Sequence, residues 1–253
     1  MFIFLNIFIV ILLGLFFGSF LGAFTYRFPK KIPFVKGRSF CPKCKKQVNW
    51  FDNIPLLSFL FLKGKCRNCK KKISFRYPLI EIISSISFLL IYLNYQADLF
   101  KVILFLFFYL LITSVVIIDL EEGIIPDELI FLGLTVSFFY ILFFDNANSF
   151  QHLLGGFSLS SFMLLLYLLT KGKGMGLGDV KFTLFPATFL LFPFNILWLF
   201  LSFLTGSFVG VILILVKKAK FGKEIAFGPF LGVSFLITLI WGQTLLKWIM
   251  PFF

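Results

Sequence analysis

Long apolar stretches separated by short polar segments dominate this chain. Each stretch holds about 20 residues with few charges, which is the length that a helix needs to cross the hydrocarbon core of a bilayer. The stretches show no strict alternation of apolar and polar residues, so the pattern predicts helices rather than a membrane barrel. We expect about eight membrane spans, at residues 2–23, 78–95, 100–118, 127–144, 152–170, 180–194, 196–216 and 225–250.

The composition excludes an ordinary soluble domain. Of the 253 residues 60% are hydrophobic, 41 are phenylalanine, and the mean hydropathy is +1.01. Soluble domains of this length carry far fewer apolar residues. The predicted fold class is therefore an all-α polytopic membrane protein, surrounded by lipid.

The positive charge of the chain is concentrated in one loop. The formal net charge is +13, and the segment from Arg27 to Arg76 alone holds 15 Lys and Arg against one acid, Asp52. A basic loop beside membrane spans is typical of the cytoplasmic side, so we interpret it in this way and not as a nucleic-acid surface. This divides the chain into a first span (1–26), a basic cytoplasmic domain (27–77) and a membrane domain (78–253).

All four cysteines lie in that basic loop, as two CxxC pairs. Cys41 and Cys44 form the first pair, Cys66 and Cys69 the second, and 21 residues separate them. A cytosolic loop keeps its thiols reduced, which favours a metal over disulfides. Two CxxC pairs at this spacing are typical of a closed, structural zinc site with four thiolate ligands. The alternative, four unconnected reduced cysteines, stays open at this point.

Two aspartates follow apolar or glycine-rich stretches. Counting the predicted spans places both aspartates on the same face of the membrane. Asp119 closes the run at 115–118, and Asp179 closes the stretch Gly174-Met-Gly-Leu-Gly-Asp. A carboxylate at a membrane boundary is costly unless it is paired or hydrated, so both are functional candidates. Asp119 lies at a predicted helix C-terminus, where the helix dipole opposes a negative charge, so it has no capping role.

Two further acids have a structural alternative. Glu81 lies one turn inside the span that begins at Pro78, where it either stabilises the helix dipole or serves as a weak candidate for binding a cofactor. Asp127 follows Pro126 at the start of a helix, and there we favour the capping role. The sole histidine, His152, is expected to be an interfacial residue on the opposite face.

Asp119 and Asp179 together predict hydrolysis by an activated water. Two carboxylates that share a site do not comfortably ionise together, so one of them keeps a proton. The charged one can deprotonate a water while the protonated one donates to a peptide carbonyl, and the sequence does not say which is which. Gly176 and Gly178 carry no side chains, which lets a substrate backbone approach. A metal held by the acids is the rival, although two aspartates offer few oxygen ligands.

An ordered set of motifs resembles the type IV prepilin leader peptidases, membrane aspartyl proteases of the GxGD class. Apart from Gly22-Ala23 and Ala226, which stand where the family often has Asn-Val and Pro, the resemblance covers nearly the whole chain. Its motifs are Gly18-Ser-Phe-Leu, Tyr26-Arg-Phe-Pro, both CxxC pairs, Trp50-Phe-Asp-Asn-Ile-Pro, Arg76-Tyr-Pro-Leu-Ile-Glu, Ile125-Pro-Asp, Gly176-Leu-Gly-Asp-Val-Lys and Phe227-Gly-Pro.

The resemblance implies an enzyme that removes the basic leader of prepilins or pseudopilins after a glycine, at the cytoplasmic face of the bacterial cytoplasmic membrane. Asp119 and Asp179 would be its catalytic residues. It further implies N-methylation of the new N-terminus from S-adenosylmethionine by the N-terminal region. Lys181, next to the glycines, is expected to contact substrate, and Glu121 and Glu122 offer negative charge that attracts a basic leader.

Other functions stay open from the residues alone. One is a peptidase without methyltransferase activity, and another is a non-enzymatic membrane protein whose four-cysteine module binds a partner. A transporter would place its acids along a path, and no inverted repeat is evident. The particular pilin-like substrate and the oligomeric state are not indicated.

Overall fold

The structure is a computed structural model that describes residues 2–33, 39–217 and 226–249. Helices make up nearly all of these ranges, and the only β-structure in them is two isolated bridges. The predicted basic loop at 217–224 and the predicted end of the last span at Met250 lie almost wholly outside the described residues. Two compact units, Met1–Leu110 and Leu111–Phe253, divide the chain.

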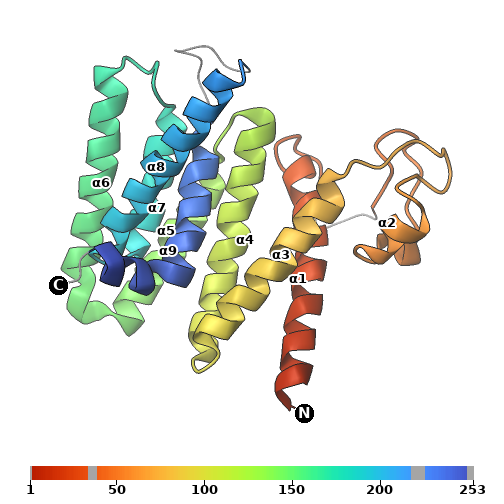
Figure 1. Cartoon of the computed structure of the whole chain (residues 1–253), viewed down its shortest axis with the longest axis horizontal. Helices are drawn as coiled ribbons and strands as arrows, with labels where there is room; N and C mark the ends of the chain where they lie inside the picture. The colour runs from red at the N-terminus through yellow and green to blue at the C-terminus, as the bar shows by residue number, and fades with distance from the viewer. Residues whose placement is uncertain (1, 34–38, 218–225, 250–253) are drawn as a thin grey trace. The chain divides into compact units, whose positions relative to one another are not determined.

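Figure 1 shows the helices in chain order. They are α1 (Phe2–Arg27), η1 (Trp50–Asn53), α2 (Leu57–Phe61), α3 (Arg76–Tyr95), α4 (Leu99–Glu122), α5 (Asp127–Phe144), η2 (Asn146–Asn148), α6 (Ser149–Leu169), α7 (Leu177–Phe189), α8 (Phe194–Leu215) and α9 (Gly228–Ile249).

Within the described ranges, seven helical segments are long and apolar enough to cross a membrane. The sixth predicted span, at 180–194, is the exception, because α7 has only 13 residues. At 1.5 Å per residue such a helix extends about 20 Å, less than the ~30 Å of a hydrocarbon core. The predicted all-α membrane fold is confirmed, with seven long helices and one short helix in place of eight full spans.

In the first unit, glycines let two helices approach closely. A Cβ added at Gly14 would lie 2.5 Å from Cα of Ser85, and one at Gly18 would lie 2.7 Å from Cα of Glu81. The backbones of α1 and α3 are therefore in direct contact, as small residues spaced by four permit. On α3, Oγ of Ser84 accepts a hydrogen bond of 3.0 Å from the hydroxyl of Tyr109 in α4, so both buried polar groups have a partner.

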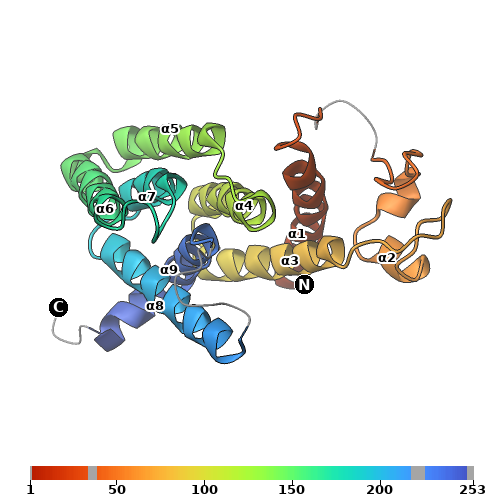
Figure 2. The ribbon, with the colours of Figure 1, turned by 90° about the horizontal axis from the view of Figure 1, so that it is seen from above.

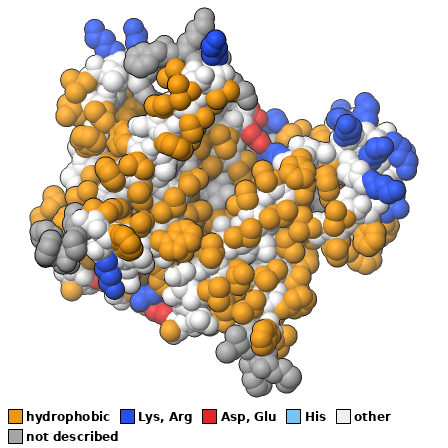
Figure 3. Space-filling model, in the orientation of Figure 1, with side chains coloured by type: hydrophobic (Ala, Val, Ile, Leu, Met, Phe, Trp, Pro, Cys, Tyr) orange, Lys and Arg blue, Asp and Glu red, His pale blue; other side chains and the backbone are white. Residues whose placement is uncertain are grey.

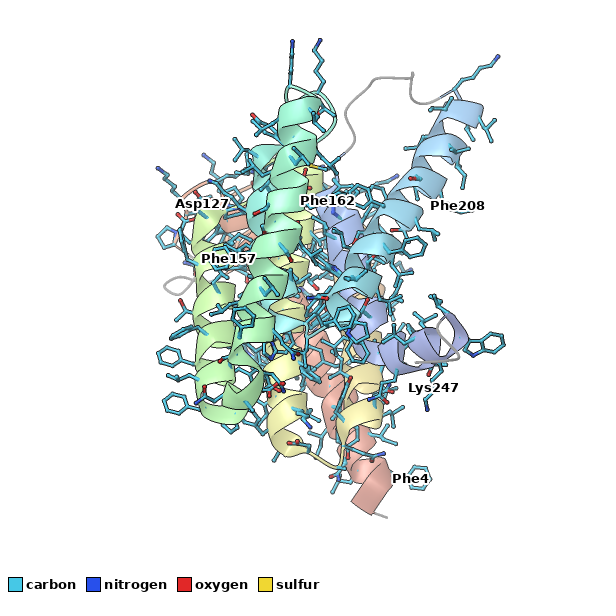
Figure 4. The ribbon with its side chains drawn as sticks, turned by 90° about the vertical axis from the view of Figure 1, so that its left-hand side faces the viewer. Phe4, Asp127, Phe157, Phe162, Phe208 and Lys247 are labelled. Atoms are coloured by element: carbon cyan, nitrogen blue, oxygen red, sulfur yellow. The ribbon has the colours of Figure 1, made fainter. Side chains whose placement is uncertain are left out.

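In the second unit, the short helix α7 is enclosed by its neighbours. It contacts α5, α6, α8 and α9, and the view in Figure 2 shows it between α5 and α6. A Cβ on Gly133 of α5 would lie 2.9 Å from the Phe185 ring of α7. The outer helices instead expose apolar side chains, and Figure 4 shows Phe157 and Phe208 projecting from α6 and α8. Lipid-facing long helices therefore surround a helix that is too short to span alone.

Candidate functional site

Asp119 lies in the last turn of α4 and is almost completely buried, with 7% of its surface exposed. Its Oδ2 is inaccessible and makes no hydrogen bond to any described residue. The first residue of α9 forms the wall beside it, because a Cβ added at Gly228 would lie only 2.5 Å from this oxygen. A buried carboxylate oxygen without a hydrogen-bond donor is costly, which makes this atom a functional candidate.

Asp179 lies in the first turn of α7, outside the seven long helices, and is 6% exposed. The Gly176 N–H donates to its Oδ2 over 3.0 Å, and its own carbonyl accepts from the Thr183 hydroxyl over 2.8 Å. The carboxylate thus fills the third position of the helix, where it satisfies a backbone donor that the helix leaves free.

The charge of Asp119 acts on Asp179. Burial raises the pKa of Asp179, the hydrogen bond from Gly176 lowers it, and the neighbouring Asp119 raises it again, to about 6. The two carboxylates therefore lie close enough to interact, although 60 residues separate them in the chain. Figure 1 shows α4 ending and α7 beginning at the same end of the helices, as span counting predicts. The shared proton and the acid and base roles predicted for this pair stay a prediction.

The glycines before Asp179 have different surroundings. Gly176 is exposed and supplies its N–H to the aspartate. Gly178 faces Ile125, and a Cβ there would lie 3.2 Å from the isoleucine side chain. Gly178 therefore lets α7 pack against the segment before α5, whereas Gly176 remains open to an approaching backbone. Contact of either glycine with a substrate stays a prediction.

Lys181 and Asp127 form an ion pair. The lysine Nζ lies 2.9 Å and 3.0 Å from the two carboxylate oxygens, and both side chains are about half exposed. Figure 4 labels Asp127 at the start of α5, which is where the capping role was predicted. Glu121 and Glu122 are exposed at the end of α4. The structure thus gives Lys181 a protein partner, and its contact with substrate, like that of the two glutamates, remains a prediction.

The four cysteines come together, as their spacing predicts. The Sγ atoms of Cys41, Cys44, Cys66 and Cys69 all lie within 4.8 Å of one another, and those of Cys41 and Cys69 are 4.0 Å apart. Tetrahedral zinc, with Zn–S bonds of about 2.3 Å, needs sulfurs roughly 3.8 Å apart. The donor set and its spacing fit zinc with little adjustment.

Two matching turns present these sulfurs. In the first, the N–H groups of Cys41 and Lys45 bond to the carbonyls of Lys46 and Cys41, and in the second Cys66 and Lys70 bond to Lys71 and Cys66 in the same way. Lys45 and Lys70 each have a φ of 57°. Burial alone would raise the pKa of Cys41, but backbone hydrogen bonds from Cys44 and Lys43 and nearby thiols lower it to about 7. A backbone hydrogen bond from Lys46 lowers the pKa of Cys44, but burial and the neighbouring thiols of Cys41 and Cys69 raise it to about 11. A thiolate is therefore favoured at Cys41 and not at both cysteines of the first turn.

Comparisons with known proteins match both the N-terminal part of the chain, which holds the cysteines, and the later part, which holds the two aspartates. The model described as the bacterial peptidase A24 N-terminal domain matches residues 12–95, and that of the type IV leader peptidase family matches residues 104–211. A prepilin leader peptidase/N-methyltransferase of Aeromonas hydrophila is 33% identical over 226 residues, which cover 83% of this chain and 74% of the relative. The chain belongs to the type IV leader peptidase family.

Other relatives in this family carry the same name. Those of Legionella pneumophila and Pseudomonas aeruginosa are each 32% identical, over 86% and 88% of this chain and 77% and 79% of their own lengths. No solved structure matches the chain.

In this member of the leader peptidase family, Glu81 has a structural role that the sequence did not indicate. It is buried in the second turn of α3, and its carboxylate accepts the Leu56 N–H over 2.8 Å. Leu56 directly precedes α2 and has a φ of 57°. Glu81 therefore anchors the loop before α2 to a membrane helix. With the carboxylate engaged in this way, the structure gives no separate support to cofactor binding.

Asp145 and His152 form a pair that sequence reasoning missed. His152 is buried within the protein, with Nδ1 2.8 Å from the Thr188 carbonyl and Nε2 3.0 Å from Oδ2 of Asp145, and its position at the membrane interface stays a prediction. The histidine holds the pKa of Asp145 below its usual range. Their spacing of seven residues across a turn was the available signal. The pair joins α6 to α7 and stays separate from the two aspartates.

Proposed function

We propose that this chain is an aspartic endopeptidase of the bacterial cytoplasmic membrane that removes the basic leader of type IV prepilins or pseudopilins. The names of its relatives support the substrate class. The observation that carries the proposal is the pair Asp119 and Asp179. Both are buried, Asp119 influences the pKa of Asp179, and one oxygen of Asp119 has no hydrogen-bond donor among the described residues.

The pair would act on a water. The ionised carboxylate takes a proton from the water as the water oxygen attacks the carbonyl carbon of the glycine before the cut, and the protonated carboxyl donates to the carbonyl oxygen. The tetrahedral intermediate then collapses, the C–N bond breaks, and the amide nitrogen leaves with the proton taken from the water. Burial of both carboxylates favours sharing of one proton, which this cycle requires.

The substrate would bind with its basic leader on the cytoplasmic side and its apolar helix in lipid. Glu121 and Glu122, exposed at the end of α4, lie three or fewer residues from Asp119 and attract the basic leader. The exposed Gly176 leaves room for an extended substrate backbone beside Asp179. Recognition thus combines charge outside the membrane with hydrophobic burial within it.

A second activity, N-methylation of the new N-terminus, follows from the names of the relatives. S-adenosylmethionine would supply the methyl group to the free amine. The alternative is a peptidase without this activity, and we assign no residue to the methyl donor. Zinc, held by Cys41, Cys44, Cys66 and Cys69, would act as a structural cross-link, because four thiolates leave no open coordination position.

The test is cleavage of a prepilin-like substrate by the purified full chain and by Asp119→Asn and Asp179→Asn. We expect cleavage after the glycine by the wild type and none by either variant, with a cooperative thermal unfolding transition at or above the wild-type temperature as proof of folding. Retained cleavage by a folded Asp119→Asn variant would remove this residue from the mechanism. Failure of the wild type on every pilin-like substrate would overturn the proposed function.

A further inference from the structure

The loop that carries the four cysteines exposes a set of large apolar side chains. Phe61 is 82% exposed and Trp50 is 78% exposed, and the other members of the set have smaller exposed fractions. The members of this set, which we call the loop apolar face, are Trp50, Phe51, Leu57, Leu60, Phe61 and Phe75. Contiguous apolar surface of this kind marks a site of contact with protein or membrane.

The members of the loop apolar face are brought together by two short helices. Leu57, Leu60 and Phe61 occupy positions i, i+3 and i+4 of α2, which place their side chains on one side of that helix. Helix α2 packs against η1, which carries Trp50 and Phe51. Figure 3 shows hydrophobic side chains gathered along the lower edge of this lobe and Lys and Arg on its upper and outer sides.

The loop cannot move far from the membrane. It begins where α1 ends, at Arg27, and it ends where α3 begins, at Arg76, and these two helices pack side by side. Arg76 ties the junction, since its guanidinium donates to the Gly22 carbonyl and to the Thr25 hydroxyl. In Figure 1, α2 lies beside the upper half of α1 and not beyond its end. Glu81 holds the residue before α2 in this position.

The charge around the loop apolar face is almost entirely positive. Eight lysines between residues 43 and 72 are exposed. Asp52 is the only acid between Arg27 and Arg76, and Arg67 neutralises it with contacts of 2.6 Å and 2.8 Å. A surface that combines exposed aromatic side chains with unneutralised lysines matches the boundary between acyl chains and anionic headgroups.

We propose that the loop apolar face lies in the interfacial layer of the membrane that α1 and α3 cross, with the surrounding lysines bound to anionic phospholipid headgroups. A lipid occupant is favoured over a protein partner because the loop joins two membrane helices and α2 lies beside one of them and not beyond its end. The zinc knuckles then form the outer side of a domain that rests on the bilayer.

The test uses the full chain in nanodiscs of phosphatidylethanolamine and phosphatidylglycerol, with the photoreactive residue p-benzoylphenylalanine in place of Phe61. The matched control carries it in place of Gln47, an exposed residue of the first knuckle. After irradiation, mass spectrometry measures phospholipid adducts, and bound zinc reports that the loop is folded. We expect several-fold more lipid adduct at position 61 than at position 47.

Lipid charge provides the second arm. In nanodiscs of phosphatidylcholine alone, the adduct yield at position 61 should fall several-fold, because the lysines lose their headgroup partners. Equal yields at positions 61 and 47, adducts to a second copy of the chain instead of lipid, or a yield unaffected by anionic lipid would each overturn the proposal.

Discussion

The ammonium group of Lys181 lies 2.9 Å from the carboxylate of Asp127 and joins α7 to the first turn of α5. Both side chains are about half exposed, and ion pairs of this kind stabilise a protein by roughly 0–1 kcal/mol. Asp127 therefore already has a cation as its partner, in contrast to Asp119, whose Oδ2 has none among the described residues.

Asp127→Asn is expected to keep its activity. Loss of a half-exposed ion pair worth about 1 kcal/mol changes a rate by roughly fivefold at most. We expect cleavage of a prepilin-like substrate within this range and a thermal midpoint lowered by about 2–4 °C or less. Complete loss of cleavage by a folded Asp127→Asn protein would show that this carboxylate, and not Asp119, belongs to the active pair.

Gly228→Ala is expected to impair cleavage although both aspartates remain. The added methyl group would lie 2.5 Å from Oδ2 of Asp119, so it must displace the carboxylate or the start of α9. A displacement that raises the barrier by about 1.4 kcal/mol slows the reaction roughly tenfold. The matched control is Gly210→Ala in α8, where an added Cβ meets nothing within 4 Å and activity should be unchanged. Equal rates for the two variants would argue against a site beside Gly228.

Asp179→Asn should be more stable than the wild type at neutral pH. Burial and Asp119 raise the pKa of Asp179 from 3.8 to about 6, so the folded state favours the protonated form. Ionisation above this range therefore destabilises the fold, by at most roughly 3 kcal/mol, and asparagine avoids this cost. The advantage of the variant should be present in full at pH 7.5 and should shrink to about a third as the pH falls to 4.5, because the cost of ionisation is lost between the folded and the unfolded pKa. Thermal unfolding in detergent at both values measures it, and a variant less stable at pH 7.5 than the wild type contradicts it.

Purified protein should hold about one zinc per chain, and Cys66→Ser should hold far less. Loss of one thiolate from four leaves an incomplete site, and the loop should become more sensitive to trypsin at its exposed lysines. Metal analysis and limited proteolysis test both points. Gln47→Ala, in the same loop but not a ligand, is the control and should keep its zinc. Wild-type protein with much less than one metal per chain would refute the zinc site.

The sequence predicted those features that depend on length, spacing and periodicity. Apolar runs of sufficient length predicted the helices, the CxxC spacing predicted the cysteine cluster, and span counting placed Asp119 and Asp179 at one end. Each follows from local geometry of the chain. The 13-residue α7 was assigned as a full span because its apolar run continues past the helix end at Phe189, into a turn that hydrophobicity does not reveal.

Features that depend on tertiary contacts were beyond the sequence. The bond from Leu56 to Glu81 joins residues 25 apart, so the sequence offered only a helix-dipole role or cofactor binding for Glu81 and did not indicate that it anchors the loop. His152 was assigned to an interface because its partners, the Thr188 carbonyl and Asp145, become visible only when α6 packs on α7. Gly228 stands out only once Asp119 is seen beside it.

The twin cysteine turns have a consequence for how the loop assembles. Each turn contributes two sulfurs, and neither alone can enclose an ion, so metal capture requires both to be formed at once. Folding of the loop and ion uptake therefore become one all-or-none event. A substitution that disrupts either turn should therefore abolish metal binding by both turns. Folding intermediates with only one formed turn should not accumulate.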